Sequence, residues 1–534
     1  MKKSLFQILQ IVLGVLLGVL LTLVVIKYQG DKAIRRAKYE QWRKLNLILS
    51  EVEKNYVDTV DNRAVTDAAV SAALSALDPH SIYLPPVEKK ESDSELEGDF
   101  EGIGIQFNVP NDTAIVLEVI SGGPSEKAGL MPGDRILKVD DEVIAGVKFP
   151  QDSMVRRMKG PSGTKVTVTV KRAAETIPFD ITRGKIPLYS IDAAFLVQDS
   201  IGYIRLQKFS RTTYREFLAA CLKLEGMKAL LLDLRDNNGG YFDQAFLLAD
   251  EFLSKGDTIV YMQGRKRPRE DYLADGHGSL QKLPLVLLIS EESASSSEIL
   301  AGAIQDNDRG VIVGRRSFGK GLVQEPINFS DGSGVRLTVA RFYTPSGRCI
   351  QKPYDNYAYD IYNRYRSGEV FSADSVHIDT NDVHRTRGGR KVYGGGGIMP
   401  DVFVPMDTTR ATSYYIALNR KASQMRFAAD FMDRHGERLR AIDTYPAMDA
   451  FLAKAALVED FRSWAARKDG IKASEEEWAK TLPYLEPQLR ALVARYSKLG
   501  QAAFYYYYIE VDETVRKGLE LFSEKEEYAR ALSN

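Results

Sequence analysis

The chain has 534 residues, more than one hydrophobic core usually holds, so we expect three or more domains. Lysine plus arginine equals aspartate plus glutamate at 72 each, and no long basic block appears, so no nucleic-acid partner is expected. The 5 histidines are scattered without an HExxH pattern, so neither a metal site nor a cofactor is expected, and Cys221 and Cys349 are too few for a disulfide framework.

The first predicted element is a membrane anchor. Residues 5–26 carry no charge and are long enough to cross a bilayer, which takes about 20 residues. No convincing small-x-small cleavage site follows, so we interpret residues 1–27 as an uncleaved anchor rather than a removed signal peptide. Basic residues are more numerous after this segment than before it, which by the positive-inside tendency favours a cytoplasmic body.

Residues 28–98 are predicted to form an N-terminal helical region followed by a linker. Helical spacing runs through residues 33–57 and 64–77 and stops at Asp78-Pro79, because proline cannot continue a helix. The stretch at 87–99, rich in glutamate, serine and aspartate, is interpreted as the linker.

Three further regions follow in chain order. From 99 to 184, short alternating strands separated by glycine turns predict a β domain. From 185 to 406, buried-strand runs alternate with helical periods, which predicts an α/β core; within it, the polar and tyrosine-rich residues 352–393 are interpreted as an insertion. Residues 407–534 have helical spacing throughout and predict a separate helical domain.

The stretch "EESASSSEILAG", residues 291–302, places four serines within five positions directly before a helical period. One interpretation is structural: Ser295 caps the helix, and Glu298, three residues later, reaches back to complete a capping box. The other interpretation makes Ser295 a nucleophile. A helix N-terminus suits both, since its positive potential and free N–H groups can also face a developing oxyanion.

A base for such a serine is found in "VGRRSFGKGLVQEP", residues 313–326. Its spacing matches a phosphate loop ending at Lys320, but Gly321 replaces the Ser or Thr that would hold magnesium. The following "LVQEPINF" is predicted to be extended rather than helical, which also argues against nucleotide binding. We therefore pair Lys320 with Ser295 as a serine–lysine dyad. A lysine is a useful base only when neutral, so its pKa must fall below the usual value of roughly 10.

An ordered set of motifs over residues 40–405 resembles the carboxyl-terminal processing peptidases, also called tail-specific proteases, of the serine–lysine class. The resemblance implies a multidomain α/β and α+β protein: a crotonase-like protease core with an inserted PDZ-like β domain, an N-terminal membrane helix and a C-terminal helical domain. The matching stretches are "LDPHSIYLPP" (77–86), "FEGIGIQF" (100–107), "AGLMPGDRILKVD" (128–140), "LLLDLRDNNGG" (230–240), "SASSSEI" (293–299), "GRRSFGKGLVQ" (314–324) and "LTVARFYTPSGRCIQ" (337–351).

By this resemblance, Ser295 falls on the family's nucleophile and Lys320 on its general base, at the family spacing. Gln324, four residues beyond the lysine, matches a helper glutamine whose amide would orient the amine. Retention of these three residues favours an enzyme over the alternative, a catalytically silent scaffold that binds peptide tails at the membrane.

The resemblance also implies an oxyanion hole made of backbone N–H groups. One comes from Ser296 and one from Gly239 or Gly240, where glycine lets the backbone approach the substrate without a Cβ in the way. Three departures stand out: Ser296 replaces the family's usual alanine, Asn237-Asn238 precede the glycines where a proline is often found, and the insertion at 352–393 separates two of the family's motifs. None of them removes a required group.

The PDZ-like region is expected to bind the C-termini of protein substrates. A short GIGI alone is more often an ordinary strand turn, but the "AGLMPGDRI" that follows resembles PDZ domains closely. The backbone N–H groups of this turn would face a peptide carboxylate while the peptide adds as a strand. A helix at 151–159 would line the pocket for an apolar tail. The residues expected at this site are Gly102, Ile103, Gly104, Ile105, Met154, Val155 and Met158.

The expected function is that of a membrane-anchored serine endopeptidase that recognises protein C-termini and cleaves through an acyl-enzyme. For its location two arguments conflict, because the flanking charges favour a cytoplasmic body whereas the resemblance implies an exported one. We give the resemblance priority. The prediction is a single-pass anchor with residues from about 28 onward on the periplasmic side.

Overall fold

The computed structural model describes Thr22 and residues 43–198, 200–355, 357–376, 381–408 and 412–533. The chain forms two compact units, residues 1–85 and residues 86–534. In the first unit, residues 43–55 are helical, and two labelled elements follow, α2 (Asn62–Ser75) and β1 (Ile82–Leu84). Asp61 caps helix α2, because its carboxylate accepts hydrogen bonds from the N–H groups of Arg63 and Ala64 in the first turn.

The anchor predicted over residues 5–26 lies outside the described residues, apart from Thr22. Among the residues that are described, no helix has both the length and the apolar character needed to cross a membrane.

The stretch at 87–99 was expected to be a linker, and this prediction was wrong. Most of it is helix α3 (Pro86–Glu97). The helix is charged throughout, but Lys89 and Asp93 lie one turn apart with their charged atoms at 2.5 Å, and such pairs stabilise a surface helix that has no strong apolar face. A polar composition therefore did not distinguish a solvated helix from a linker.

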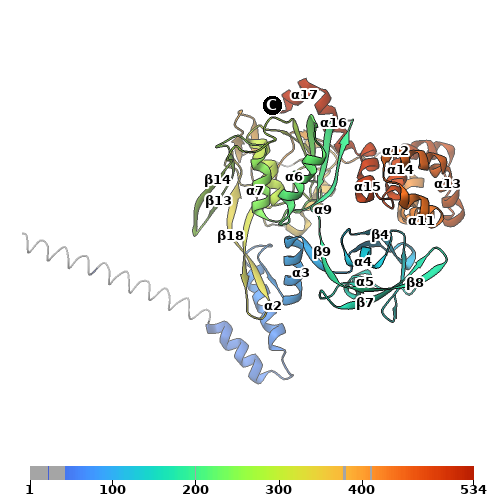
Figure 1. Cartoon of the computed structure of the whole chain (residues 1–534). Coiled ribbons are helices and arrows are strands. Elements are labelled where there is room, and N and C mark those ends of the chain that lie inside the picture. The colour runs from blue at the N-terminus through green and yellow to red at the C-terminus, as the bar shows by residue number, and fades with distance from the viewer. Residues whose placement is uncertain are drawn as a thin grey trace, which may run out of the picture. The chain divides into compact units, whose positions relative to one another are not determined.

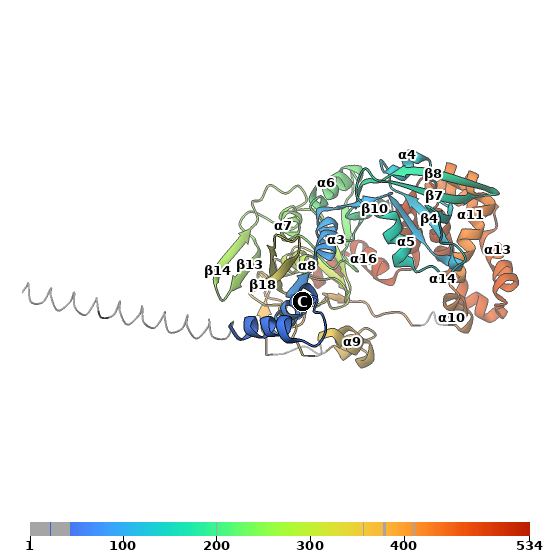
Figure 2. The same ribbon diagram turned by 90° about the horizontal axis from the view of Figure 1, so that it is seen from below.

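The β domain has its own core and two short helices (Figure 1). Its main sheet runs in the order β3-β4-β5-β7-β8, with β6 on β5, while β2 pairs with β9. Strands β7 and β8 lie side by side in both ribbon views (Figure 2). The helix predicted at 151–159 is present. The elements are β2 (Asp99–Gly102), β3 (Ile105–Asn108), β4 (Ala114–Val119), α4 (Pro124–Ala128), β5 (Arg135–Val139), β6 (Glu142–Val143), α5 (Gln151–Met158), β7 (Lys165–Arg172), β8 (Glu175–Thr182) and β9 (Gly184–Pro187).

The predicted alternation of strands and helices forms a sheet in the order β10-β11-β12-β15-β16-β21. Strand β10 is antiparallel to β11, and the remaining neighbours are parallel. The elements are β10 (Ile191–Val197), β11 (Ile201–Leu206), α6 (Thr213–Lys223), β12 (Ala229–Asp233), α7 (Phe242–Asp250), β15 (Leu285–Ile289), α8 (Ser296–Asp306), β16 (Val311–Gly314) and β21 (Val402–Phe403).

Both faces of this sheet are buried, which explains why its strands are apolar without alternation. Leu230 and Leu232 of β12 pack in one hydrophobic cluster with α6, α7 and α8, whereas Leu231 packs in a second cluster with the C-terminal helices. Cys221, on α6, is a free thiol, and burial raises its pKa to about 12. Helix α8 packs on the sheet through the first of these clusters, to which Ile299 and Leu300 belong.

A second, antiparallel sheet was not predicted as a unit. Strand β18 pairs with β13 on one side and with β17 on the other, and β14 pairs with β13. The extended structure expected for "LVQEPINF" is confirmed as β17. The elements are β13 (Thr258–Gly264), β14 (Arg267–Leu273), β17 (Leu322–Asn328) and β18 (Gly334–Tyr343).

The segment at 352–393, which was interpreted as an insertion, contains helix α9 and the hairpin β19–β20. The helical region predicted over residues 407–534 is also present. The insertion has η2 (Tyr357–Tyr359), α9 (Asp360–Ser367), η3 (Ala373–Ser375), β19 (Val383–Arg385) and β20 (Lys391–Tyr393). The C-terminal region has α10 (Ser413–Arg420), α11 (Ser423–Ala441), α12 (Tyr445–Lys454), α13 (Leu457–Trp464), α14 (Glu475–Ala494), α15 (Gly500–Tyr508), α16 (Glu513–Ser523) and α17 (Lys525–Ala531).

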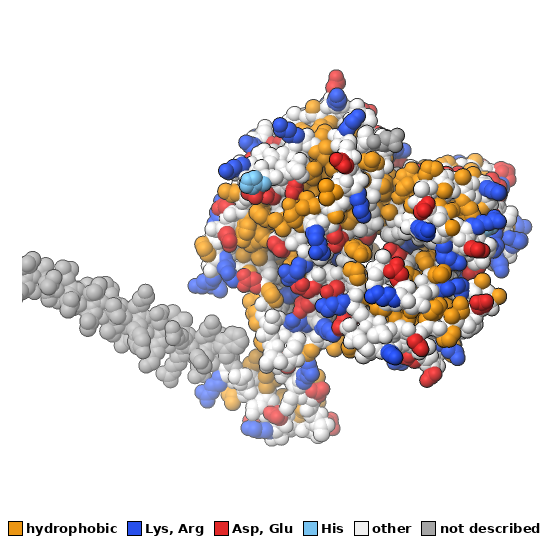
Figure 3. All heavy atoms as spheres, viewed as in Figure 1, with side chains coloured by type: hydrophobic (Ala, Val, Ile, Leu, Met, Phe, Trp, Pro, Cys, Tyr) orange, Lys and Arg blue, Asp and Glu red, His pale blue; other side chains and the backbone are white. Residues whose placement is uncertain are grey.

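Charged side chains of both signs are interspersed over the face drawn in Figure 3.

Candidate active site

The four clustered serines have different partners. Ser293 Oγ donates to the carbonyl of Leu234 at 2.8 Å, and Ser297 Oγ donates to the carbonyl of Asn237 at 2.8 Å. Both side chains are fully buried. Within the described residues, the half-buried Ser295 has no such carbonyl partner for its hydroxyl.

Ser295 has a positive φ of 55°, with ψ of −112°. A residue with a Cβ adopts a positive φ only at a cost, and such strain collects at functional sites. Ser295 directly precedes α8, a helix whose residues are all buried. The packing of this helix in the core therefore fixes the position of the turn at Ser295.

The glycine loop after β12 lies directly against Ser295. A Cβ built on Gly239 would lie 2.8 Å from the Ser295 Cβ and 2.9 Å from the Ser296 nitrogen, so only glycine fits at this approach. The Gly239 N–H donates to Asn237 Oδ1 at 2.9 Å. Of the two glycines that the sequence left open, Gly240 is therefore the one whose N–H is not engaged by Asn237.

Ser296 connects this glycine loop to the start of α8. Its Oγ donates to the Gly240 carbonyl at 2.9 Å, and its own N–H belongs to the first residue of the helix, where no intrahelical acceptor exists. Ser296, which replaces the family's usual alanine, thus holds the glycine loop in place through this hydrogen bond. The same loop carries the Gly240 N–H, the second candidate for the oxyanion hole.

Glu298 joins the serine turn to the lysine loop, residues 315–321. Its Oε2 accepts from the N–H groups of Ser295 and Lys320, each at 2.9 Å. Its Oε1 accepts from Ser317 Oγ at 2.5 Å and from the Gly319 N–H at 2.7 Å. Burial raises the pKa of Glu298, and these hydrogen bonds oppose that rise. One carboxylate therefore brings the backbones of Ser295 and Lys320 together.

The expected contact from Glu298 back to the Ser295 N–H is confirmed, but the links to the lysine loop were missed. The capping-box spacing was the available signal, and it could not reveal partners that lie about twenty residues further along the chain.

Lys320 and Gln324 lie on adjoining segments. Lys320 is half-buried and follows Gly319, whose φ of 89° requires glycine. Gln324 is half-buried on β17, opposite Thr338 of β18. Their roles as base and helper stay predictions.

The β domain presents an edge strand beside α5. Strand β3 is the last strand of its sheet, so one of its edges is open to an added strand. Gly104 has a φ of 81°, and its carbonyl accepts from the Ile120 N–H. Met154 and Met158 pack in the core of the domain, while Val155 is half-buried on the same helix. Gly102, Ile103 and Ile105 flank this turn at the ends of β2 and β3.

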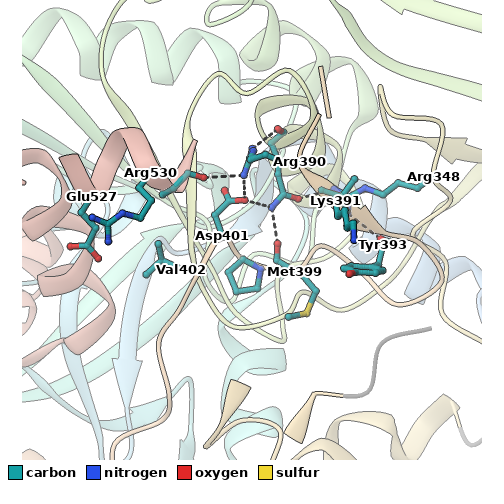
Figure 4. Close-up of a pocket in the computed structure, with 13 residues that line it drawn as sticks. Arg348, Arg390, Lys391, Tyr393, Met399, Asp401, Val402, Glu527 and Arg530 are labelled. Carbon is teal, nitrogen blue, oxygen red and sulfur yellow. Dashed lines mark hydrogen bonds and ion pairs between the residues drawn. The ribbon is translucent and has the colours of Figure 1, made fainter. Parts of the chain in front are cut away.

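The pocket drawn in Figure 4 has a volume of about 400 Å³ and lies apart from these residues. At its centre, Arg390 donates to Asp401 at 2.5 Å and to the carbonyl of Ala531 on α17 at 3.1 Å. Burial raises the pKa of Asp401, and Arg390 opposes that rise. These contacts fasten α17 to the core, which is a structural role.

Comparison with known proteins finds three family matches. Residues 102–182 match the PDZ domain, residues 200–361 match peptidase family S41, and residues 414–497 match a family of unknown function.

Two relatives have similar sequences over the central part of the chain. The carboxy-terminal-processing protease of Bartonella bacilliformis is 36% identical over 320 residues, which covers 59% of this chain and 73% of that protein. The carboxyl-terminal-processing protease of Synechocystis sp. is 36% identical over 310 residues, covering 56% and 72%. Among solved structures, a photosystem II D1 C-terminal processing protease is 27% identical and covers 67% of this chain and 86% of its own, with a TM-score of 0.36.

Proposed function

The chain belongs to the carboxy-terminal processing proteases of peptidase family S41, and on this premise we propose that it cleaves peptide bonds with Ser295 as nucleophile and Lys320 as general base. It is a serine-type endopeptidase with a PDZ domain. The observation that carries the assignment is the convergence of the Ser295 and Lys320 N–H groups on Glu298 Oε2. Retention of Ser295, Lys320 and Gln324 at the family spacing favours this enzyme over a silent scaffold.

In the proposed mechanism, the neutral Lys320 amine takes the proton of Ser295 Oγ, which attacks the substrate carbonyl. The N–H groups of Ser296 and Gly240 stabilise the negative charge that develops on the carbonyl oxygen. Lys320 then returns the proton to the leaving amine, and water hydrolyses the acyl-enzyme. Gln324 orients the amine by hydrogen bonding.

The PDZ domain selects substrates in this proposal. An apolar protein C-terminus adds as a strand to the open edge of β3, and its carboxylate meets the N–H groups at Gly104 and Ile105. Val155 and Met158 of α5 contact the last side chain of the substrate.

The test is cleavage of an unstructured protein with an apolar C-terminus by the full chain in detergent. Ser295→Ala and Lys320→Ala are each expected to lower kcat by at least about 10³-fold, because both act in the bond-making step. Ser297→Ala, which removes one hydroxyl bonded to a carbonyl, is expected to cost only a few-fold. An unchanged rate for Ser295→Ala, or a larger loss for Ser297→Ala, contradicts the assignment.

We also propose that residues 5–26 anchor the enzyme in the membrane with its catalytic body on the periplasmic side. The apolar length of the segment supports the anchor. Protease added to spheroplasts is expected to digest the body, and protection of the body would reverse the orientation.

A further inference from the structure

The lysine loop has neither helix nor strand, so its shape depends on what holds its backbone. The N–H groups of Gly319 and Lys320 are held by Glu298, as described above. The Phe318 N–H donates to the carbonyl of Ser293 at 3.0 Å. These contacts all come from the segment that contains Ser293 and Glu298, and they involve only the N–H groups of the loop. The carbonyls of the loop have other partners.

Three consecutive carbonyls of the loop are held by one guanidinium from the insertion. Arg364, on α9, donates from Nη1 to the carbonyls of Arg316 at 3.1 Å and Ser317 at 2.9 Å, and from Nη2 to the carbonyl of Phe318 at 3.2 Å. The side chain of Arg364 is only 3% exposed. The planar fork of arginine can serve three consecutive carbonyls, whereas the single ammonium of lysine cannot reproduce that geometry.

Arg364 is itself fixed by acidic partners in the insertion. Its Nη2 lies 3.0 Å from Asp360 Oδ2, one helical turn earlier, and Lys352 Nζ lies 2.9 Å from the same oxygen. Burial alone would raise the pKa of Asp360, but Arg364 and Lys352 hold it below its usual range. The carboxylate is therefore ionised at neutral pH and balances the buried guanidinium.

The insertion contacts the loop at two further points. The Lys352 N–H donates to the Gly319 carbonyl at 3.0 Å, and Lys352 Nζ lies 3.6 Å from the centroid of the Phe318 ring. Arg316 forms a two-pronged ion pair with Glu369, at 2.6 and 2.8 Å. Each residue from 316 to 319 is thus tied to the insertion.

We propose that Arg364 is a positioning residue for the general base: by holding three carbonyls of the lysine loop, it keeps the Lys320 amine aligned with Ser295. The inference rests on the proposed function, because it takes Lys320 to be the base. Among the contacts that hold the loop, Glu298 comes from the nucleophile helix and Arg364 from the segment inserted before residue 394, while the Ser317 N–H donates to the carbonyl of Ile398 at 3.0 Å.

The experiment compares Arg364→Met, Arg364→Lys and a matched control, Arg366→Met, in the full chain. Arg366 lies on the same helix and is exposed. Arg364→Met is expected to lower kcat by about 10²-fold with KM within about threefold, because displacing a reacting group by about 1 Å costs that much without weakening substrate binding. Arg364→Lys is expected to restore little, since it keeps the charge but not the fork. The control keeps the wild-type rate.

A second arm tests whether Arg364 acts through Lys320. The double variant Lys320→Ala, Arg364→Met is expected to have the residual kcat of Lys320→Ala alone, since a positioning contact is worth nothing once the positioned amine is gone. A further loss of about 10²-fold in the double variant overturns the inference. If Lys320→Ala keeps the wild-type rate, the dyad itself is wrong, and this outcome is separate from the first.

Thermal unfolding is recorded for every variant, and rates are compared well below each midpoint. If Arg364→Met does not fold, Arg364→Lys carries the same comparison. Loss of the folded state in both variants makes Arg364 a purely structural residue and overturns the inference, as does an equal fall of kcat in the Arg366→Met control.

Discussion

Glu298 is fully buried and accepts four hydrogen bonds, three from backbone N–H groups and one from a hydroxyl. An ionised carboxylate is the side chain that can accept from all four donors at once, because it has two oxygens and no hydrogen. Its place on the first turn of α8 also suits a negative charge. The same residue type that caps a helix thus organises the site.

We therefore predict that Glu298→Gln lowers kcat by about 10²-fold, because the amide turns an N–H₂ group toward two of the donors and lets the lysine loop shift. The free energy of unfolding is expected to fall by about 1–3 kcal/mol, the usual cost of unsatisfied buried polar groups. Steady-state kinetics and urea unfolding measure the two effects. Glu325→Gln, exposed on β17, is the control and is expected to change neither; an unaltered kcat in Glu298→Gln would refute the role.

At the scale of the elements, strand β12 ends at Asp233, a buried carboxylate that is paired with two arginines and lies close to the glycine loop in sequence. Asp233 is fully buried and accepts from Tyr203 at 2.9 Å, Arg205 at 3.0 Å and Arg235 at 2.7 Å. Burial alone would raise the pKa of Asp233, but Arg235 and Arg205 hold it well below its usual range. Ion pairs with arginine therefore hold the end of β12. Arg205 also pairs with Asp236 at 2.9 Å, where the glycine loop begins.

Asp233→Asn is expected to lower the free energy of unfolding at pH 7 by about 3 kcal/mol, because two buried guanidinium groups lose the carboxylate between them. The depressed pKa of Asp233 means that its stabilisation is complete above the unfolded value of about 3.9 and is lost as the pH falls through the folded value. The difference between wild type and variant should therefore narrow in acid.

Urea unfolding at neutral pH and in acid measures this difference. Asp271→Asn, whose carboxylate is exposed and paired with Arg269, serves as the control and is expected to match wild type. A difference for Asp233→Asn that grows toward low pH would show that the carboxylate is not stabilised by its arginines.

At the scale of the whole molecule, the PDZ domain is packed on the C-terminal helices. Arg135 on β5 donates to Asp433 on α11 at 2.5 Å, and Arg440 donates to the Pro132 carbonyl at 3.0 Å. Met432 contacts Gly133, where any Cβ would clash with it. The contact is partly polar and partly apolar, since Leu117 on β4 also packs in the hydrophobic cluster of the C-terminal helices.

A domain tethered at both ends can move over the proposed catalytic residues without leaving them, so we predict that substrate tails control activity. A non-cleavable peptide with an apolar C-terminus is expected to raise the initial cleavage rate of a short reporter that does not bind the PDZ domain. The shift requires that the peptide bind the open form better, since a ligand with equal affinity for both forms shifts nothing.

Stopped-flow cleavage of the reporter measures this effect. The same peptide with an amidated C-terminus is the control and is expected to have no effect, because the N–H groups near Gly102 and Gly104 lose their anionic partner. Equal rates of reporter cleavage with and without the free peptide would exclude regulation by substrate tails, but they would not affect the assignment of Ser295 and Lys320.

The two sheets of the core and helix α3 show which elements can be predicted from local sequence patterns and which cannot. Apolar runs such as 228–235 and 283–290 predicted the parallel strands, because strands buried on both faces are continuously apolar. The sheet of β13, β14, β17 and β18 was missed, since its exposed strands have a mixed composition. The composition of helix α3 predicts a linker, because the pair of Lys89 and Asp93 that stabilises the helix depends on geometry rather than on hydrophobicity.

The amino-acid sequence by itself determined the order of the motifs, the separation of Ser295 from Lys320, the parallel strands and the PDZ-like region, because these depend on neighbours in the chain. Only the tertiary structure decided which serine hydroxyls are bonded to carbonyls, that Asn237 engages the Gly239 N–H, and that Arg364 holds the lysine loop. Each of these rests on hydrogen bonds between segments brought together by folding, and such pairings leave no periodicity in the sequence.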